Sequence, residues 1–123
     1  MVTQSQSYGR KAEDVAARQL KQSGYKIIER NFRNEIGEID IIAMERKTTV
    51  FVEVKARKNS RFGSPKRAVT LQKQRKISMV ALAYLKTHGK NGSPARFDVV
   101  SVSGPIETPE IEIVKNAFEL AYT

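Results

Sequence analysis

The chain has 123 residues and a large excess of positive charge, with 22 Lys and Arg against 13 Asp and Glu. This length is enough for a single domain, residues 1–123, with a modest core. The sequence has no cysteine, which excludes thiolate metal sites and cysteine nucleophiles, and no apolar run long enough for a membrane span or a signal peptide. We therefore expect a cytoplasmic protein with no membrane partner.

The first predicted element is a helix over Tyr8–Ser23, ended by Gly24. Small apolar residues recur in it at helical spacing, and Glu13 shares their side of the helix with Ala16 and Leu20. An acidic side chain that faces a core is usually paired or bound to a metal ion, because burying it alone is costly. Helical spacing leaves both a salt bridge and a metal role open for Glu13.

After a strand predicted over Tyr25–Arg33, two segments alternate between apolar and charged side chains, residues 37–43 and 50–55. This period-two pattern predicts two half-buried strands that form an antiparallel hairpin. A turn centred on Arg46 and Lys47 sets the register of the pair. It places Asp40 opposite Glu53, Glu38 opposite Lys55 and Ile42 opposite Phe51, with an apolar reverse face of Ile39, Ile41, Ala43, Val50, Val52 and Val54.

The polar face of this hairpin carries the residues that indicate chemistry. Opposed side chains in an antiparallel pair have Cβ atoms about 4.5–5.5 Å apart, and two carboxylates so close repel each other unless a cation lies between them. Mg²⁺ prefers oxygen ligands and often uses only one or two carboxylates, so Asp40 and Glu53 predict a magnesium site. Lys55 points to the same side, where it can stabilise developing negative charge. A shift of the register by one residue would instead bury the acids.

The remaining elements complete an α/β pattern. A polar loop over Arg57–Pro65 leads to a long helix over Thr70–Thr87, at whose end His88 can meet the helix carbonyls. A strand over Arg96–Ser103 has apolar residues on both sides, which is typical of a central strand. The predicted order is α-β-β-β-α-β followed by a short strand and helix, over Ile111–Val114 and Asn116–Tyr122.

The positive charge is unevenly distributed along the chain. From Val54 to Phe97 there is no acidic residue, whereas 12 basic residues fall in this stretch. Such an excess attracts polyanions, and nucleic acid is favoured because the basic stretch adjoins the acidic pair. A solvated surface that only keeps the protein soluble is the alternative. The basic residues that we expect to contact nucleic acid are Arg57, Lys58, Arg61, Lys66, Lys73 and Lys76.

Glu13, Ile39-Asp40 and Glu53-Val54-Lys55, followed by a basic helix, together resemble the motif of the PD-(D/E)xK nuclease superfamily. The sequence resembles more closely the YraN-like family of small bacterial proteins, from Gly9 to about Phe118. It is also similar to archaeal Holliday junction resolvases of the same superfamily. The runs that carry the closer resemblance are Arg30–Arg33, Gly37–Asp40, Phe51–Arg57, Phe62-Gly63 and Arg96–Val100.

The resemblance implies a restriction-endonuclease-like fold, with a central mixed β-sheet flanked by helices. It also implies Mg²⁺ or Mn²⁺ held by Asp40, Glu53 and the carbonyl of Val54, joined by Glu13 directly or through water. Lys55 would orient or activate the attacking water.

One position departs from the superfamily motif: Ile39 stands where the name of the superfamily has proline, and this residue does not touch the acids. Lys73 and Lys76 match basic positions of the family, so they are expected to meet phosphates.

The function that the resemblance implies is a metal-dependent endonuclease that hydrolyses DNA, branched or damaged DNA among its substrates. A homodimer is one alternative for its oligomeric state, because junction-cutting relatives act as dimers. A non-catalytic nucleic-acid-binding module and a basic protein that docks to a ribosome or a replication assembly are the rival hypotheses. A module that only binds would not need Lys55 beside Glu53, and this favours the enzyme.

Overall fold

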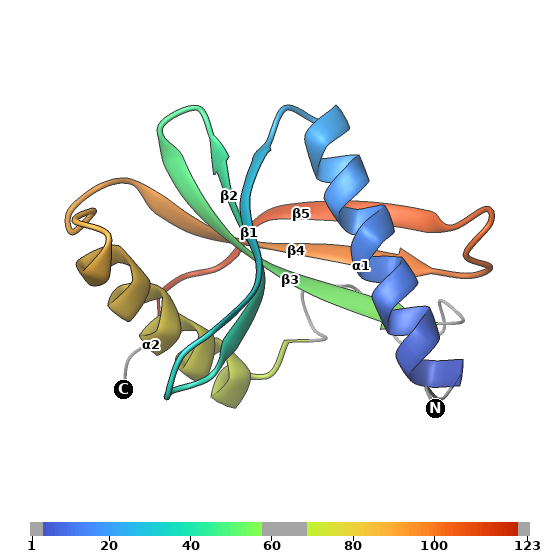
Figure 1. Ribbon diagram of the computed structural model, residues 1–123, viewed down its shortest axis with the longest axis horizontal. Coiled ribbons are helices and arrows are strands. Elements are labelled where there is room, and N and C mark those ends of the chain that lie inside the picture. Colours follow the sequence, from blue (N-terminus) through green and yellow to red (C-terminus); the bar gives the residue numbers. More distant parts are fainter. Residues whose placement is uncertain (1–3, 58–68, 121–123) are drawn as a thin grey trace.

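The computed structural model describes residues 4–57 and 69–120, in which two helices flank a five-stranded sheet (Figure 1). The elements are α1 (Gln4–Gln22), β1 (Lys26–Arg33), β2 (Glu38–Glu45), β3 (Thr48–Arg57), α2 (Leu71–Thr87), β4 (Ala95–Ser103) and β5 (Glu110–Phe118). The strands lie in chain order across the sheet, and β3 and β4 pair in parallel while the other neighbours pair antiparallel. The predicted mixed sheet with flanking helices is therefore confirmed.

The two helices cover opposite faces of the sheet, so the core has two layers (Figure 1). In one layer Val80 of α2 packs in the same cluster as Phe51 of β3. In the other layer Leu20 of α1 packs in the same cluster as Val52, the next residue of β3. Successive residues of a strand point to opposite faces, which is why β3 is apolar at adjacent positions where both faces are covered.

The hairpin of β2 and β3 has the predicted register from the turn to Ile41 and Val52, whereas the predicted pairs Asp40–Glu53 and Glu38–Lys55 are not part of the ladder. Ile42 pairs with Phe51, and the pairing continues to Glu45 and Thr48 beside the turn. The turn itself contains only Arg46 and Lys47, and Arg46 has a φ of 56°. A positive φ at the first of the two turn residues is common to the turn types that two-residue hairpins favour, although asparagine or glycine adopts it more readily than arginine.

The apolar face of β2 differs from the prediction at one position. Regular pairing with β3 ends at Ile41 and Val52, and beyond it a carboxylate oxygen of Asp40 accepts the N–H of Val54 at 2.8 Å. Ile39 was expected beside Ile41, but it is buried in the layer beneath α2, so that prediction is wrong. Side chains alternate strictly between the two faces only where the strands form a regular ladder of backbone hydrogen bonds. Here the carboxylate of Asp40, and not a backbone carbonyl, accepts the N–H of Val54.

The predicted closing helix is wrong in its described part, up to residue 120, because β5 continues to Phe118. The ring of Phe118 stacks on Phe97 of β4 at 4.9 Å between centroids, and Ala117 is also buried. The strands shift register near this end, where Asn116 has a φ of 53°. A short helix is marginal by itself, whereas pairing with a central strand buries both residues and satisfies the backbone.

The helices are close to their predicted bounds, although α1 begins earlier, at Gln4. The hydroxyl of Thr70 accepts the N–H of Lys73 and caps α2. At the other end, Nδ1 of His88 lies 2.9 Å from the carbonyl oxygen of Tyr84, which confirms the predicted capping role. All of the predicted polar loop after Arg57 lies outside the described residues. Among the helices that the structure describes, none is long and apolar enough to cross a membrane.

Candidate active site

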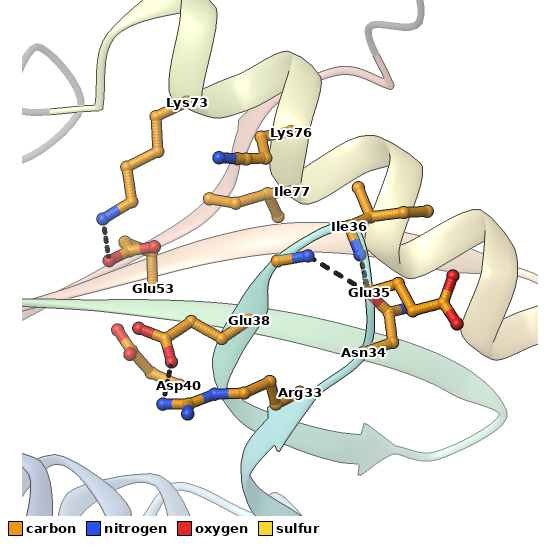
Figure 2. A pocket seen from close by; sticks show the side chains of 11 residues that line it. Arg33, Asn34, Glu35, Ile36, Glu38, Asp40, Glu53, Lys73, Lys76 and Ile77 are labelled. Atoms are coloured by element: carbon orange, nitrogen blue, oxygen red, sulfur yellow. Dashed lines mark hydrogen bonds and ion pairs between the residues drawn. The ribbon is translucent and has the colours of Figure 1, made fainter.

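A cleft of about 360 Å³ opens between the first turns of α2, the β1–β2 loop and the neighbouring strands (Figure 2). Asp40 of β2 and Glu53 of β3 contribute carboxylates to its lining. Lys73 and Lys76 of α2 contribute ammonium groups. The structure thus brings two acidic residues and two basic residues, all predicted from the sequence, to one cleft.

Glu53 is the most buried acidic residue of the cleft, with 7% of its side chain exposed. Nζ of Lys73 forms an ion pair with Oε1 of Glu53 at 3.0 Å, reaching down from the first turn of α2 (Figure 2). Burial, and then the negative charge of Asp40, raise the pKa of Glu53 to about 7, although Lys73 acts in the opposite direction. The single positive charge of Lys73 therefore does not fully compensate the negative charge of Glu53 and Asp40 in the cleft.

Asp40 lies at the point where β2 and β3 separate. Its Oδ2 accepts the N–H of Val54 at 2.8 Å, which fixes the carboxylate between the two strands. The half-buried carboxylate lines the cleft, where it also interacts with the side chain of Glu53. In Figure 2 Asp40 and Glu38 lie on the side of the cleft away from α2, whereas Glu53 lies beneath Lys73.

Lys55 follows Glu53 by two residues on β3 and is half-buried. Burial, and then the charge of Lys73, lower the pKa of Lys55, whereas Glu53 and Asp40 oppose this change. Two lysines and two carboxylates are thus within electrostatic reach of one another. A lysine with a lowered pKa beside a buried carboxylate is typical of functional sites, although structural ion-pair networks also produce it.

Glu13 of α1 lies outside this cleft. It pairs with Arg30 at 3.6 Å, while the same guanidinium is closer to Asp14, at 2.7 Å. Burial, and then the negative charge of Asp40, raise the pKa of Glu13, so the two acids are electrostatically coupled. Within residues 4–57 and 69–120, no three acidic or histidine side chains are close enough to hold a metal ion together. Among the described residues the structure therefore shows the ion pair of Glu13 with Arg30 but no three-acid pocket of Glu13, Asp40 and Glu53, so a metal role of Glu13 stays a prediction.

The β1–β2 loop forms a wall of the cleft that the sequence interpretation missed. Oδ1 of Asn34 accepts the N–H groups of Ile36 at 2.9 Å and Gly37 at 3.2 Å. A Cβ atom added to Gly37 would lie 3.3 Å from Cγ of Lys76, so this glycine allows the loop to approach α2 closely. The spacing Asn34-x-x-Gly37 is typical of an Asx turn and was the available signal.

The predicted nucleic-acid contacts are only partly within the described structure. Lys73 and Lys76 line the cleft, and Arg57 ends β3. The other three, Lys58, Arg61 and Lys66, lie outside the described residues.

The raised pKa of Glu53 predicts a dependence of stability on pH. Between pH 4.5, the ordinary pKa, and about 7, the folded state binds more protons than the unfolded state, so stability falls as the pH rises through this window. Glu53→Gln removes this titration, so the variant should not lose this stability as the pH rises. Without divalent ions, the difference in free energy of unfolding between the variant and the wild type should therefore shift in favour of the variant by up to about 3 kcal/mol from pH 4.5 to pH 8. Urea unfolding of both proteins at the two pH values measures this. Parallel changes in both proteins would contradict it.

Comparison with known proteins identifies a family. The model of a family described as "Uncharacterised protein family UPF0102" matches residues 12–102. A UPF0102 protein of Desulfosudis oleivorans is 50% identical over 119 residues, which cover 97% of this chain and 95% of the relative. A UPF0102 protein of Syntrophus aciditrophicus is 48% identical over 121 residues, covering 98% and 95%.

Among solved structures, the chain is similar to Pyrococcus furiosus SfsA in complex with Ca²⁺, with a TM-score of 0.40 and 14% sequence identity. The match covers 90% of this chain and 63% of the SfsA chain. A similarity of this size does not by itself establish a shared fold.

Proposed function

This chain belongs to the UPF0102 family, as its resemblance to the YraN-like proteins predicts, and we propose that it is a metal-dependent endonuclease that hydrolyses the phosphodiester bonds of DNA. One observation carries the proposal: Asp40 and the buried Glu53 line one cleft, with Lys73 in it and Lys55 close by. The order of Asp40, Glu53 and Lys55 in the sequence, which resembles the PD-(D/E)xK nucleases, supports the same function. Branched or damaged DNA are the substrates that this resemblance favours.

The donor set of the cleft fits a hard divalent cation. Mg²⁺ prefers oxygen ligands, often uses one or two carboxylates and keeps several waters, so two acids are enough. Asp40, Glu53 and the carbonyl of Val54 would hold Mg²⁺ or Mn²⁺, with Glu13 acting through water. When bound, the ion would supply a water of lowered pKa and neutralise charge on the scissile phosphate.

The residues of the chain then have separate tasks. The bond from Val54 N–H keeps the carboxylate of Asp40 in one orientation. Lys55 would orient the attacking water and stabilise the charge that develops on the phosphate. Lys73 and Lys76, on the wall formed by α2, would bind the phosphates of the substrate. The basic side chains position the backbone without reading its sequence.

The ion pair of Lys73 with Glu53 favours a second candidate function. It gives Glu53 a positive partner without any metal ion, as a module that binds nucleic acid without cleaving it would require. The position of Lys55 near the same carboxylates favours the enzyme, because binding alone does not need it there.

A cleavage assay distinguishes the two functions. The full chain is incubated with labelled duplex, branched and single-stranded DNA, in Mg²⁺, in Mn²⁺ and in EDTA. The nuclease predicts products from at least one substrate that require the divalent ion. Binding of all three substrates with no cleavage of any would support the non-catalytic module instead.

Replacement of Lys73 and Lys76 by Ala should weaken the binding of DNA of every sequence. Each phosphate contact that is lost should make the slope of log K against log salt less negative by about 0.9. Fluorescence anisotropy at several salt concentrations measures both effects. The control removes two exposed lysines away from the cleft, Lys21 and Lys86, and should change binding less. Equal effects of the two double variants would indicate that the cleft makes no specific phosphate contact.

Glu13→Gln should leave the fold intact, because the amide is nearly isosteric and burial already disfavours the charged carboxylate. We expect it to weaken binding of Mn²⁺ about tenfold, as the loss of a residue that supports metal ligands does. Melting curves with and without the ion measure both properties, and Asp14→Asn is the matched control beside the same Arg30. A lower melting temperature with an unchanged response to Mn²⁺ would show that Glu13 serves only the salt bridge.

A further inference from the structure

Lys73 occupies a position that the proposed cation would need. Its Nζ lies 3.0 Å from Oε1 of Glu53, which lines the cleft together with Asp40. The N-cap of α2 holds the backbone of Lys73 in place, because the hydroxyl of Thr70 accepts the N–H of Lys73. The lysine therefore projects from the first turn of the helix across the cleft to the sheet (Figure 2).

The charges of the cleft explain why the ammonium group of Lys73 and a divalent ion do not fit beside Glu53 together. Asp40 and Glu53 supply two negative charges, and Lys55 and Lys73 supply two positive charges within reach of them. The other carboxylates of the cleft, Glu35 and Glu38, are exposed, and Glu38 is already paired with Arg33. A divalent ion at Glu53 would therefore leave a positive excess close to a nearly buried carboxylate. Like charges at such short range repel strongly, so one positive group must move away or an anion must enter.

The partner that can move is Lys73. Its side chain is 45% exposed, whereas that of Glu53 is 7% exposed. A lysine has a flexible four-carbon stem and keeps its ammonium group hydrated when it turns towards solvent. Lys76 lies three residues further along the same helix and also lines the cleft, so a displaced Lys73 would still lie on a positively charged wall.

We propose that Lys73 is a positioning residue that holds the place of the cation at Glu53 in the free protein and is displaced when the metal binds. This inference rests on the proposed function, since it requires the metal site. Displacement releases Lys73 towards the open part of the cleft, where the phosphate backbone of the substrate is the anion that restores the charge balance. Binding of the metal and of nucleic acid would then support each other.

The test measures binding of Mn²⁺ to the full chain by electron paramagnetic resonance of the free ion, without substrate. Lys73→Met removes the competing ammonium group and keeps the length of the side chain. It should bind Mn²⁺ about three- to tenfold more tightly than wild type, the range expected when a half-exposed ion pair no longer competes. Lys76→Met removes the same charge from the same wall without this ion pair, and it should change the affinity less than about twofold. Lys73→Arg retains a cation and should return the affinity to about that of wild type.

Each outcome is decisive. Unchanged or weaker binding by Lys73→Met, in a wild type that binds Mn²⁺, would overturn the displacement and leave the proposed metal site intact. An equal gain in Lys73→Met and Lys76→Met would also overturn it, because the effect would then be general electrostatics. A wild type that binds no Mn²⁺ would overturn the proposed function itself.

Discussion

Asp40→Asn is expected to lower the rate of DNA cleavage about 10²–10³-fold, the usual loss when one group that stabilises transition-state charge is removed. The substitution keeps an oxygen that can accept the N–H of Val54, the bond that Asp40 makes at 2.8 Å, so the local fold should remain. It removes the negative charge with which Asp40 would hold the proposed metal ion. Single-turnover cleavage in Mg²⁺ measures the loss, and anisotropy in EDTA should show that DNA binding is retained.

The matched control is Asp14→Asn, the same chemical change on the exposed side of α1. It should cleave at the rate of wild type. If Asp40→Asn cleaved as fast as this control, the assignment of Asp40 as a metal ligand would be wrong.

Asp98→Ala is expected to destabilise the protein by about 3–5 kcal/mol, the typical result of removing one partner of a buried ion pair. Asp98 is fully buried, and its carboxylate accepts bonds from the Tyr25 hydroxyl at 2.7 Å, from Nε of Arg96 at 2.9 Å and from the N–H of Asn116 at 2.9 Å. Alanine would leave all three donors without this acceptor. The midpoint of urea unfolding measures the loss.

Asp98→Asn should cost less than Asp98→Ala, because the amide oxygen can still accept some of these bonds. Glu112→Ala, at an exposed position of β5, should change the free energy of unfolding by less than about 0.5 kcal/mol. A loss for Asp98→Ala no larger than that of Glu112→Ala would show that the network adds nothing to stability.

The hairpin could be predicted from the sequence because its pattern and its turn are local. Alternation fixes which side chains share a face, and the centre at Arg46 and Lys47 fixes which residues pair. Both rules act over a few residues, and the observed pairs, from Ile41–Val52 to Glu45–Thr48, agree with them. The prediction was wrong where a tertiary bond intervenes, at Ile39, because the side chain of Asp40 replaces regular pairing there.

Long-range partners could not be predicted in the same way. Asn116–Phe118 is compatible with a helix or a strand by itself, and only its pairing with β4 selects the strand. The ion pair of Lys73 with Glu53 joins residues on α2 and β3, so no spacing in the sequence indicates it. The role of Asp98 depends likewise on Tyr25, which belongs to a distant part of the chain.

Thermal melting of the wild type in EDTA, Mg²⁺ and Mn²⁺, with Asp40→Asn in parallel, tests most directly whether Asp40 and Glu53 form a metal site. An ion that binds only the folded state stabilises it by about 1.4 kcal/mol at ten times its dissociation constant. For a domain of this size that corresponds to a rise of roughly 3–6 °C in the melting temperature. We predict such a rise for the wild type and a much smaller one for Asp40→Asn. A wild-type melting temperature that does not respond to either ion, or an equal rise in Asp40→Asn, would contradict the site.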